Sequence, residues 1–268
     1  MIVRGYSTTP SGQVHWRMIE PEQVPTRPDL YCLHPAPFSG LAYTTIMPFL
    51  ARDRRVIAPD FPGHGGSDTC DAEPSIGDYA KAMLAVVDHL SPAKPVDVTG
   101  FHTGNLVAVE MALADNGPTG RLALVDVPAF DPDSRAKFLP VAGKPFAISP
   151  NLQCLEGPWD RGMSKRLDSQ GPDRSFAMFA EQLRHGKHMN AAFRAAFSYD
   201  VEGRLPMVTA PALVMASQSG LLEATRRAAK LISSAKLVER LDIKRAVLDE
   251  AAAETAAEIL GFLDQDRR

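Results

Sequence analysis

A histidine at the apex of a glycine-flanked turn is the first candidate for chemistry. Residues 98–104 read Val-Thr-Gly-Phe-His-Thr-Gly, so His102 is the centre of a Gly-x-X-x-Gly sequence between a predicted strand and a predicted helix. Glycines beside the apex let the backbone reverse sharply, which lifts the central side chain above the sheet. The helix N-terminus disfavours an imidazolium, so we predict a neutral ring near pH 7, which can act as a base, a nucleophile or a metal ligand.

The elements around this turn alternate between short β-rich runs and helical periods, which predicts an α/β fold with a mostly parallel sheet and helices on both faces. We expect strands at residues 13–19, 30–33, 55–59, 96–99, 122–127, 212–216 and 236–241, and helices at residues 40–52, 76–90, 103–114, 221–232 and 249–263. The alternation stops after Pro128, where prolines, glycines and amphipathic segments follow. The predicted division is a core of residues 1–128 and 207–268 and an inserted helical cap of residues 129–206.

Four segments of the chain resemble one protein family in sequence and in order. They are Leu-Tyr-Cys-Leu-His-Pro-Ala-Pro-Phe-Ser-Gly at residues 30–40, Arg-Val-Ile-Ala-Pro-Asp-Phe-Pro-Gly-His-Gly-Gly-Ser-Asp at residues 55–68, the turn at residues 100–104, and Ala-Pro-Ala-Leu-Val-Met-Ala at residues 210–216. The chain resembles the α/β-hydrolase superfamily, in the capped branch that holds esterases, epoxide hydrolases, haloalkane dehalogenases and carbon-carbon bond hydrolases. The resemblance implies the α/β-hydrolase fold, with an eight-stranded type of sheet and a helical cap.

The resemblance also implies an oxyanion hole made of two backbone N–H groups. One belongs to the residue after the turn apex, which is Thr103, and the other to Ala36 in the loop after the first buried strand. Main-chain donors survive changes of side chain, so we expect this half of the site to be intact.

The side chains of the catalytic triad depart from the family pattern. His102 replaces the nucleophile, Ser219 stands where the acid is expected, and no histidine follows His188. Some relatives place the acid after the preceding strand, where this chain has Asp126. A serine mechanism therefore cannot operate, and Asp126 is the candidate carboxylate that orients His102 or acts as an acid.

Three interpretations of His102 remain open. It is a base or a direct nucleophile in a hydrolase-like reaction, because acyl-imidazoles are labile enough to turn over. Alternatively, it removes a proton in a lyase or isomerase reaction while the oxyanion hole holds an enolate or alkoxide. In the third interpretation the protein binds a ligand without catalysis, which the loss of all three triad side chains favours.

Several other residues have a structural and a functional interpretation. The predicted pocket includes His34, Phe101, Trp159 and Ser219, although we expect His34 mainly to shape the oxyanion loop. His64 and Asp60 are expected to support the glycine-rich turn. His185 and His188 are spaced for a metal pair, but a solvated cap face is the favoured interpretation, and we expect no metal.

Composition limits the partners of the chain. With 268 residues, a net charge of −3 and no basic block, it lacks the charge pattern of a nucleic-acid-binding protein. Three cysteines without metal-ligand spacing indicate free thiols in a reducing compartment. The absence of an apolar signal core or a stretch long enough for a bilayer predicts no membrane partner and a cytoplasmic location. We expect a small-molecule substrate or ligand and no cofactor, and a homodimer is compatible with the sequence.

Overall fold

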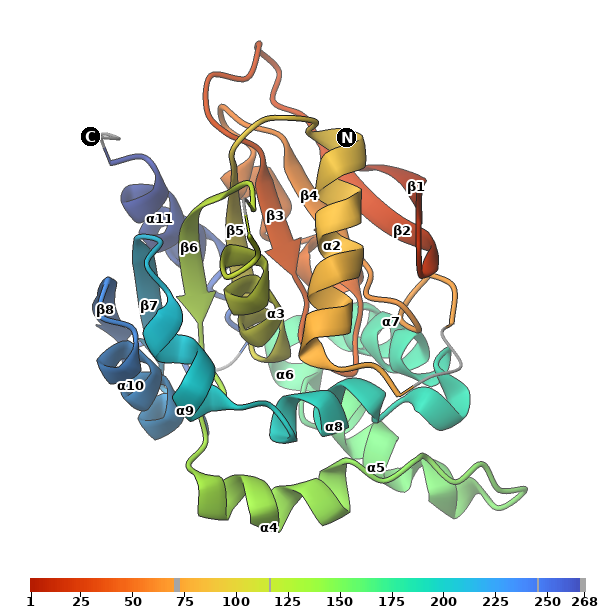
Figure 1. The fold of residues 1–268 in the computed structure, drawn as a ribbon. Helices are drawn as coiled ribbons and strands as arrows, with labels where there is room; N and C mark the ends of the chain where they lie inside the picture. The colour runs from red at the N-terminus through yellow and green to blue at the C-terminus, as the bar shows by residue number, and fades with distance from the viewer. Residues whose placement is uncertain (70–72, 116, 245, 266–268) are drawn as a thin grey trace.

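The centre of the computed structural model is an eight-stranded sheet with the order β1-β2-β4-β3-β5-β6-β7-β8 (Figure 1). The structure describes residues 1–69, 73–115, 117–244 and 246–265. The strands are β1 (Val3–Thr9), β2 (Gly12–Ile19), β3 (Leu30–Leu33), β4 (Val56–Pro59), β5 (Val96–Phe101), β6 (Thr119–Val125), β7 (Ala212–Ser217) and β8 (Ala235–Arg240). β2 runs antiparallel to both β1 and β4, and the other neighbouring strands are parallel. The predicted mostly parallel sheet is confirmed, but β1 was not predicted.

Helices cover both faces of the sheet because the central strands are apolar on both sides. In β3, Tyr31 and Leu33 belong to one core while Leu30 and Cys32 belong to the other. The first core packs under α2 (Ile76–Leu90), α3 (Thr103–Ala112) and α10 (Leu222–Leu231), and the second under α1 (Met47–Leu50) and α11 (Ala252–Leu263). Successive strand side chains point to opposite faces, so one short strand supplies both cores.

The helix predicted at residues 40–52 is wrong in its extent. The structure has a 3₁₀ turn at Gly40–Tyr43 and then the separate short helix α1. The break precedes Pro48, which lies in the first turn of α1. Proline has no N–H and clashes with a preceding helical turn, so a helix begins near it rather than continuing through it.

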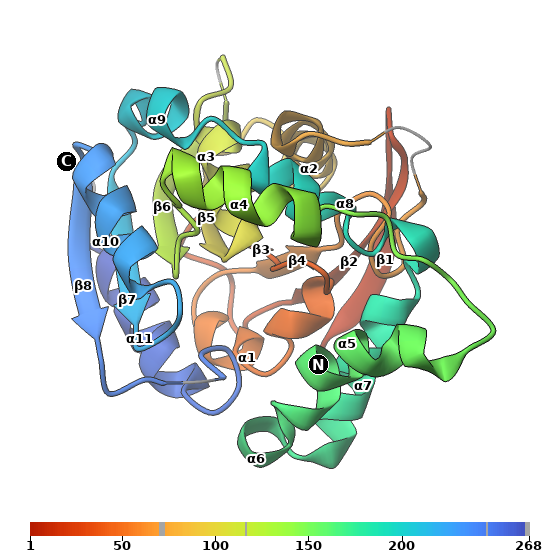
Figure 2. The same ribbon diagram turned by 90° about the horizontal axis from the view of Figure 1, so that it is seen from below.

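All regular elements between β6 and β7 are helical. They are α4 (Pro132–Ala142), α5 (Glu156–Trp159), α6 (Leu167–Gln170), α7 (Pro172–Leu183), α8 (Ala191–Phe197) and α9 (Val201–Arg204), with short 3₁₀ and π turns between them. Figures 1 and 2 show α4, α5 and α8 lying beyond the carboxyl ends of the central strands. That residues 129–206 act as a separate cap stays a prediction. Among the residues that the structure describes, none of the helices has the length and apolar character needed to span a bilayer.

The turn between β5 and α3 owes its shape to its apex and to the close packing of its glycines. His102 itself has a positive φ of 50° with ψ at −120°, a conformation that costs a non-glycine residue energy. Gly100 and Gly104 are needed for a different reason. A Cβ on Gly100 would lie 2.5 Å from the Asn105 nitrogen, and one on Gly104 would lie 2.0 Å from the Leu33 oxygen. The glycines therefore let α3 approach β3 and β5.

We expect Gly104→Ala to lower the free energy of unfolding by about 1 to 3 kcal/mol, because the added methyl group meets backbone that cannot rotate away. Urea unfolding measures the change. Gly261→Ala is the matched control, since Gly261 is exposed in α11 and its added Cβ meets nothing within 4 Å. That control should gain up to about 1 kcal/mol from helix propensity. Equal stability of the Gly104→Ala variant and the unaltered protein would contradict the packing argument.

Candidate functional site

A cavity of about 440 Å³ brings together residues from several separate segments of the chain. The predicted site residues that line it are Ala36, Phe101, His102, Asp126 and Ser219. They follow β3, β5, β6 and β7 or end those strands, and the carboxyl ends of parallel strands meet at one edge of a sheet. The topology thus places the turn apex and the candidate carboxylate in one cavity.

The His102 ring is half-buried in this cavity and neutral near pH 7. Burial lowers its pKa from 6.5 to about 4; the carboxylate of Asp126 opposes this shift and the charge of Arg166 adds to it. The ring also packs against Phe101, with 4.1 Å between the ring centroids. A neutral imidazole has a free lone pair, so His102 is in the protonation state that a base or nucleophile needs.

The carboxylate of Asp126 is fully buried and is held by Ser217. The Ser217 backbone N–H donates to Oδ1 at 2.8 Å and its hydroxyl donates to Oδ2 at 2.6 Å. Asp126 acts on His102 through its charge, and no hydrogen bond joins the two side chains within the described part of the chain. The sequence did not identify Ser217, because only the register of β6 beside β7 brings it to Asp126.

The two amides expected to form the oxyanion hole belong to buried residues, and of the two residues only Ala36 lines the cavity. Thr103 is the first residue of α3, so its N–H points out of the helix and has no intrahelical acceptor. Over the residues that the structure describes, neither this amide nor that of Ala36 donates a hydrogen bond to another residue. The Ala36 residue itself lines the cavity.

Two residues predicted at the pocket lie elsewhere. His34 is fully buried behind the loop, where its Nδ1 donates to the Pro35 carbonyl at 3.1 Å and its Nε2 accepts from the Phe61 N–H at 2.9 Å. These partners fix a neutral ring with its proton on Nδ1, which agrees with the expected loop-shaping role. Trp159 is 43% exposed and packs edge-on against Phe179, away from the cavity lining.

The expectation that His185 lies on a solvated face is wrong. Its side chain is buried, and its ring lies 4.5 Å from that of His64, which in turn lies 5.4 Å from that of His34. The residue follows α7 and meets His64 and the Gly63 backbone of the loop after β4, so its helical spacing from His188 does not place both rings in solvent. Burial lowers the pKa of His64 to about 3 and that of His185 to about 4.

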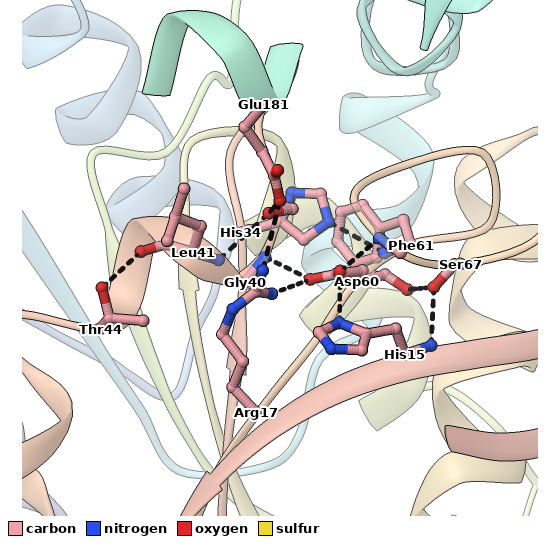
Figure 3. Close-up of polar contacts among 12 residues, drawn as sticks. His15, Arg17, His34, Gly40, Leu41, Thr44, Asp60, Phe61, Ser67 and Glu181 are labelled. Atoms are coloured by element: carbon pink, nitrogen blue, oxygen red, sulfur yellow. Dashed lines mark hydrogen bonds and ion pairs between the residues drawn. The ribbon is translucent and has the colours of Figure 1, made fainter. Parts of the chain in front are cut away.

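A buried polar network around Asp60 joins β2 and the loops after β3 and β4 to α7 (Figure 3). The Asp60 carboxylate accepts hydrogen bonds from His15 Nδ1 at 2.8 Å, Arg17 Nη1 at 2.7 Å and the Gly40 and Gly66 amides at 2.8 and 2.9 Å. Glu181 of α7 accepts from Arg17 and from the Ser39 hydroxyl. The predicted contact of Asp60 with its glycine turn is present, but its pairing with Arg17 was not predicted.

Arg166 is a cavity residue that the sequence analysis missed. It follows the π turn at Asp160–Ser164, its Nε donates to the Arg161 carbonyl at 3.0 Å, and its guanidinium lies 4.7 Å from the centroid of the Phe38 ring. The irregular turns of this region give no periodic signal that could have identified it. In the described ranges, no group of three or more His, Cys, Asp or Glu side chains is arranged to bind a metal ion.

Comparison with known proteins identifies relatives over most of the chain. A model of the alpha/beta hydrolase family matches residues 30–258. A methyl ester esterase for pimeloyl-[acyl-carrier protein] from Aromatoleum aromaticum is 34% identical over 37% of this chain and 37% of that protein. A provisionally named carbamate hydrolase from Variovorax paradoxus is 27% identical over 65% of this chain and 66% of that protein. The chain therefore matches less than two thirds of the length of each of these relatives.

Solved structures match the fold over almost the full length. A hydrolase from Pseudomonas aeruginosa superposes with a TM-score of 0.79 and 18% identity, covering 97% of this chain and 98% of that chain. An enol-lactonase from Burkholderia xenovorans superposes with a TM-score of 0.79 and 19% identity, covering 97% of this chain and 100% of that chain. At such identities the likeness concerns the fold.

Proposed function

Because the chain belongs to the alpha/beta hydrolase family, we propose that it hydrolyses a small-molecule carboxylic ester or lactone with His102 as the general base. One observation carries the proposal: a neutral imidazole lines the cavity from the apex of a strained turn, beside backbone amides without a partner among the described residues. The names of an esterase and an enol-lactonase among the similar proteins support the substrate class.

The proposed reaction needs no hydroxyl on the protein. His102 removes a proton from a water molecule as the water oxygen bonds to the substrate carbonyl carbon. The amides of Ala36 and Thr103 stabilise the negative charge that develops on the carbonyl oxygen. Collapse of the intermediate breaks the bond to the leaving alkoxide, which takes the proton from His102, so an ester gives an acid and an alcohol and a lactone gives a hydroxy acid. The negative charge of Asp126 stabilises the imidazolium that forms between these steps.

The second candidate function is ligand binding without turnover. It is favoured by the hydrogen bonds of Asp126, whose two oxygens are engaged by Ser217 rather than by His102. A lyase or isomerase would use the same base and the same amides. Turnover of a substrate that has an acidic C–H group and no ester would identify that class of reaction.

Replacement of His102 separates these functions. We expect His102→Ala to lower kcat/KM for the best substrate among p-nitrophenyl acetate, methyl hexanoate and a simple lactone by about 10²- to 10⁴-fold, which is the usual contribution of a general base. His188→Ala is the control, because His188 lies outside the cavity lining. His102→Ser should not restore turnover, since the hydroxyl would lack a base. Retention of activity within threefold in His102→Ala would refute the proposed role.

A further inference from the structure

The cavity that contains His102 has more cationic than free anionic side chains. Arg161, Lys165, Arg166 and Lys244 line it, and the acidic residues of its lining are Asp126 and Asp249. Both carboxylates already accept hydrogen bonds from other residues of the protein. Asp126 is held by Ser217, and Asp249 accepts from Arg174 Nε at 3.0 Å and from the Thr45 hydroxyl at 2.6 Å. The cavity therefore retains a net positive charge.

Among the cationic side chains of the cavity, Arg166 is the one best placed to bind an anion. Lys165 pairs with Asp160 at 2.6 Å, and Arg161 and Lys244 are exposed. Arg166 is half-buried, only its Nε is engaged, by the carbonyl of Arg161, and no carboxylate lies within ion-pair distance of it in the described part of the chain. Phe38 stacks against its guanidinium and restrains its plane, so the terminal N–H groups form a pre-oriented fork. A partly buried guanidinium without an anion costs free energy that a ligand anion would recover.

The electrostatic environment of Arg166 also favours the binding of an anion. Burial lowers the pKa of Arg166, and the nearby charge of Arg174 adds to this effect while Asp249 opposes it. Arg166 in turn lowers the pKa of His102, so the guanidinium and the proposed base share one electrostatic environment. The remaining lining is largely apolar and includes Phe38, Met178, Phe193, Val247 and Leu248. An apolar chain that links a reacting carbonyl to an anionic end would match this lining.

We propose that the substrate is an ester or lactone that carries a free carboxylate, and that Arg166 binds this carboxylate as the specificity-determining residue. The inference rests on the proposed function, whose substrate class it narrows. A carboxylate matches the planar fork of a guanidinium with two parallel hydrogen bonds. The volume of about 440 Å³ lies within the range of small-molecule sites and suits a short chain between the two groups.

The test compares two esters of the same chain length. Monomethyl adipate carries a carboxylate where methyl hexanoate ends in a methyl group, and we expect the protein to prefer monomethyl adipate. Arg166→Gln should raise KM for monomethyl adipate by about 10- to 100-fold with a smaller change in kcat, and should lower the kcat/KM preference for monomethyl adipate over methyl hexanoate by about the same factor. Arg166→Lys should recover part of the affinity, because it keeps the charge without the fork. Arg184→Gln is the matched control, since Arg184 does not line this cavity.

A binding measurement distinguishes failure of this inference from failure of the proposed function. Calorimetry should detect adipate binding to the unaltered protein and to His102→Ala, and a loss of at least tenfold in affinity in Arg166→Gln. Arg166-dependent adipate binding without turnover of any ester would support the anion site and refute the hydrolase. Equal kcat/KM for the two esters, or an unchanged preference in a folded Arg166→Gln variant, would overturn the inference. Thermal unfolding of each variant checks that it is folded.

Discussion

Lowering the pH from 7 to 5 should destabilise the protein severely, because three of its histidines are buried in the neutral form and the half-buried His102 is neutral as well. Burial lowers the pKa of His34 and His64 to about 3 and that of His102 and His185 to about 4, from 6.5. His34 and His64 also repel each other when charged, and so do His64 and His185. In the unfolded chain each ring takes up a proton at its ordinary pKa, so acid favours unfolding.

The sign and the pH window follow from these pKa values. Above pH 6.5 the rings are neutral in both states, so they add no pH dependence. Between pH 6.5 and about 4 the unfolded chain binds more protons, and each histidine lowers the free energy of unfolding by about 1.4 kcal/mol per pH unit. Four of them give a slope of up to about 5.6 kcal/mol per pH unit, against a typical total stability of about 5 to 15 kcal/mol. Asp60, whose pKa is held at about 2, contributes only below pH 4.

Urea unfolding at pH 7, 6 and 5 measures this slope. His185→Gln should reduce it by about 1.4 kcal/mol per pH unit, because one proton is no longer taken up on unfolding. His188→Gln, at a half-exposed position of the same turn, is the matched control for the substitution itself. Unaltered stability between pH 7 and pH 5 would show that the four rings do not control acid unfolding.

The sequence predicted those parts of the fold that depend on local pattern. Alternating apolar strands and the amphipathic residues 76–90 appear as elements within a few residues of their expected ends. The predicted neutral state of His102 also holds, although burial is the main cause and the helix terminus was the stated one. The family segments identified Ala36 and His102, and Asp126 was assigned from its place after a predicted strand; the structure brings all three to one cavity.

The parts that the sequence did not predict depend on contacts between distant residues. Ser217 reaches Asp126 through strand register, and Arg166 enters the cavity from irregular turns. His185 was expected in solvent, but the packing of α7 buries it against His64. None of these contacts has a local periodic signal, because each side chain meets a partner far along the chain. Cys70, expected to be a free thiol, lies outside the described residues, while Cys32 and Cys154 are free.

Replacing Asp60 with alanine should lower the free energy of unfolding by about 3 to 5 kcal/mol, the usual cost of breaking a buried ion pair from one side. Burial alone would raise the pKa of Asp60, but the hydrogen bond from His15 and the charge of Arg17 outweigh it and hold the pKa at about 2. The carboxylate is 0% exposed and also accepts the amides of Gly40 and Gly66. Removal of the carboxylate leaves these amide donors and the 5% exposed Arg17 without their acceptor.

A double-mutant cycle tests whether the loss comes from the stranded charge or from lost packing. Arg17→Met removes the charge and keeps an apolar stem, so Asp60→Ala combined with Arg17→Met should cost less than the sum of the single variants. The coupling should be at least about 1 kcal/mol, because Arg17 Nη1 and Asp60 Oδ1 lie 2.7 Å apart and both side chains are buried. Asp78→Ala in the exposed capping box of α2 is the control and should cost only about 1 kcal/mol. Additive effects in the cycle would mean that the amide donors of the loops, rather than the ion pair, make Asp60 necessary.

The Arg17 variant of this cycle also tests the attachment of α7, because Arg17 forms a hydrogen bond with Glu181. Loss of that contact should speed proteolysis of residues 172–183.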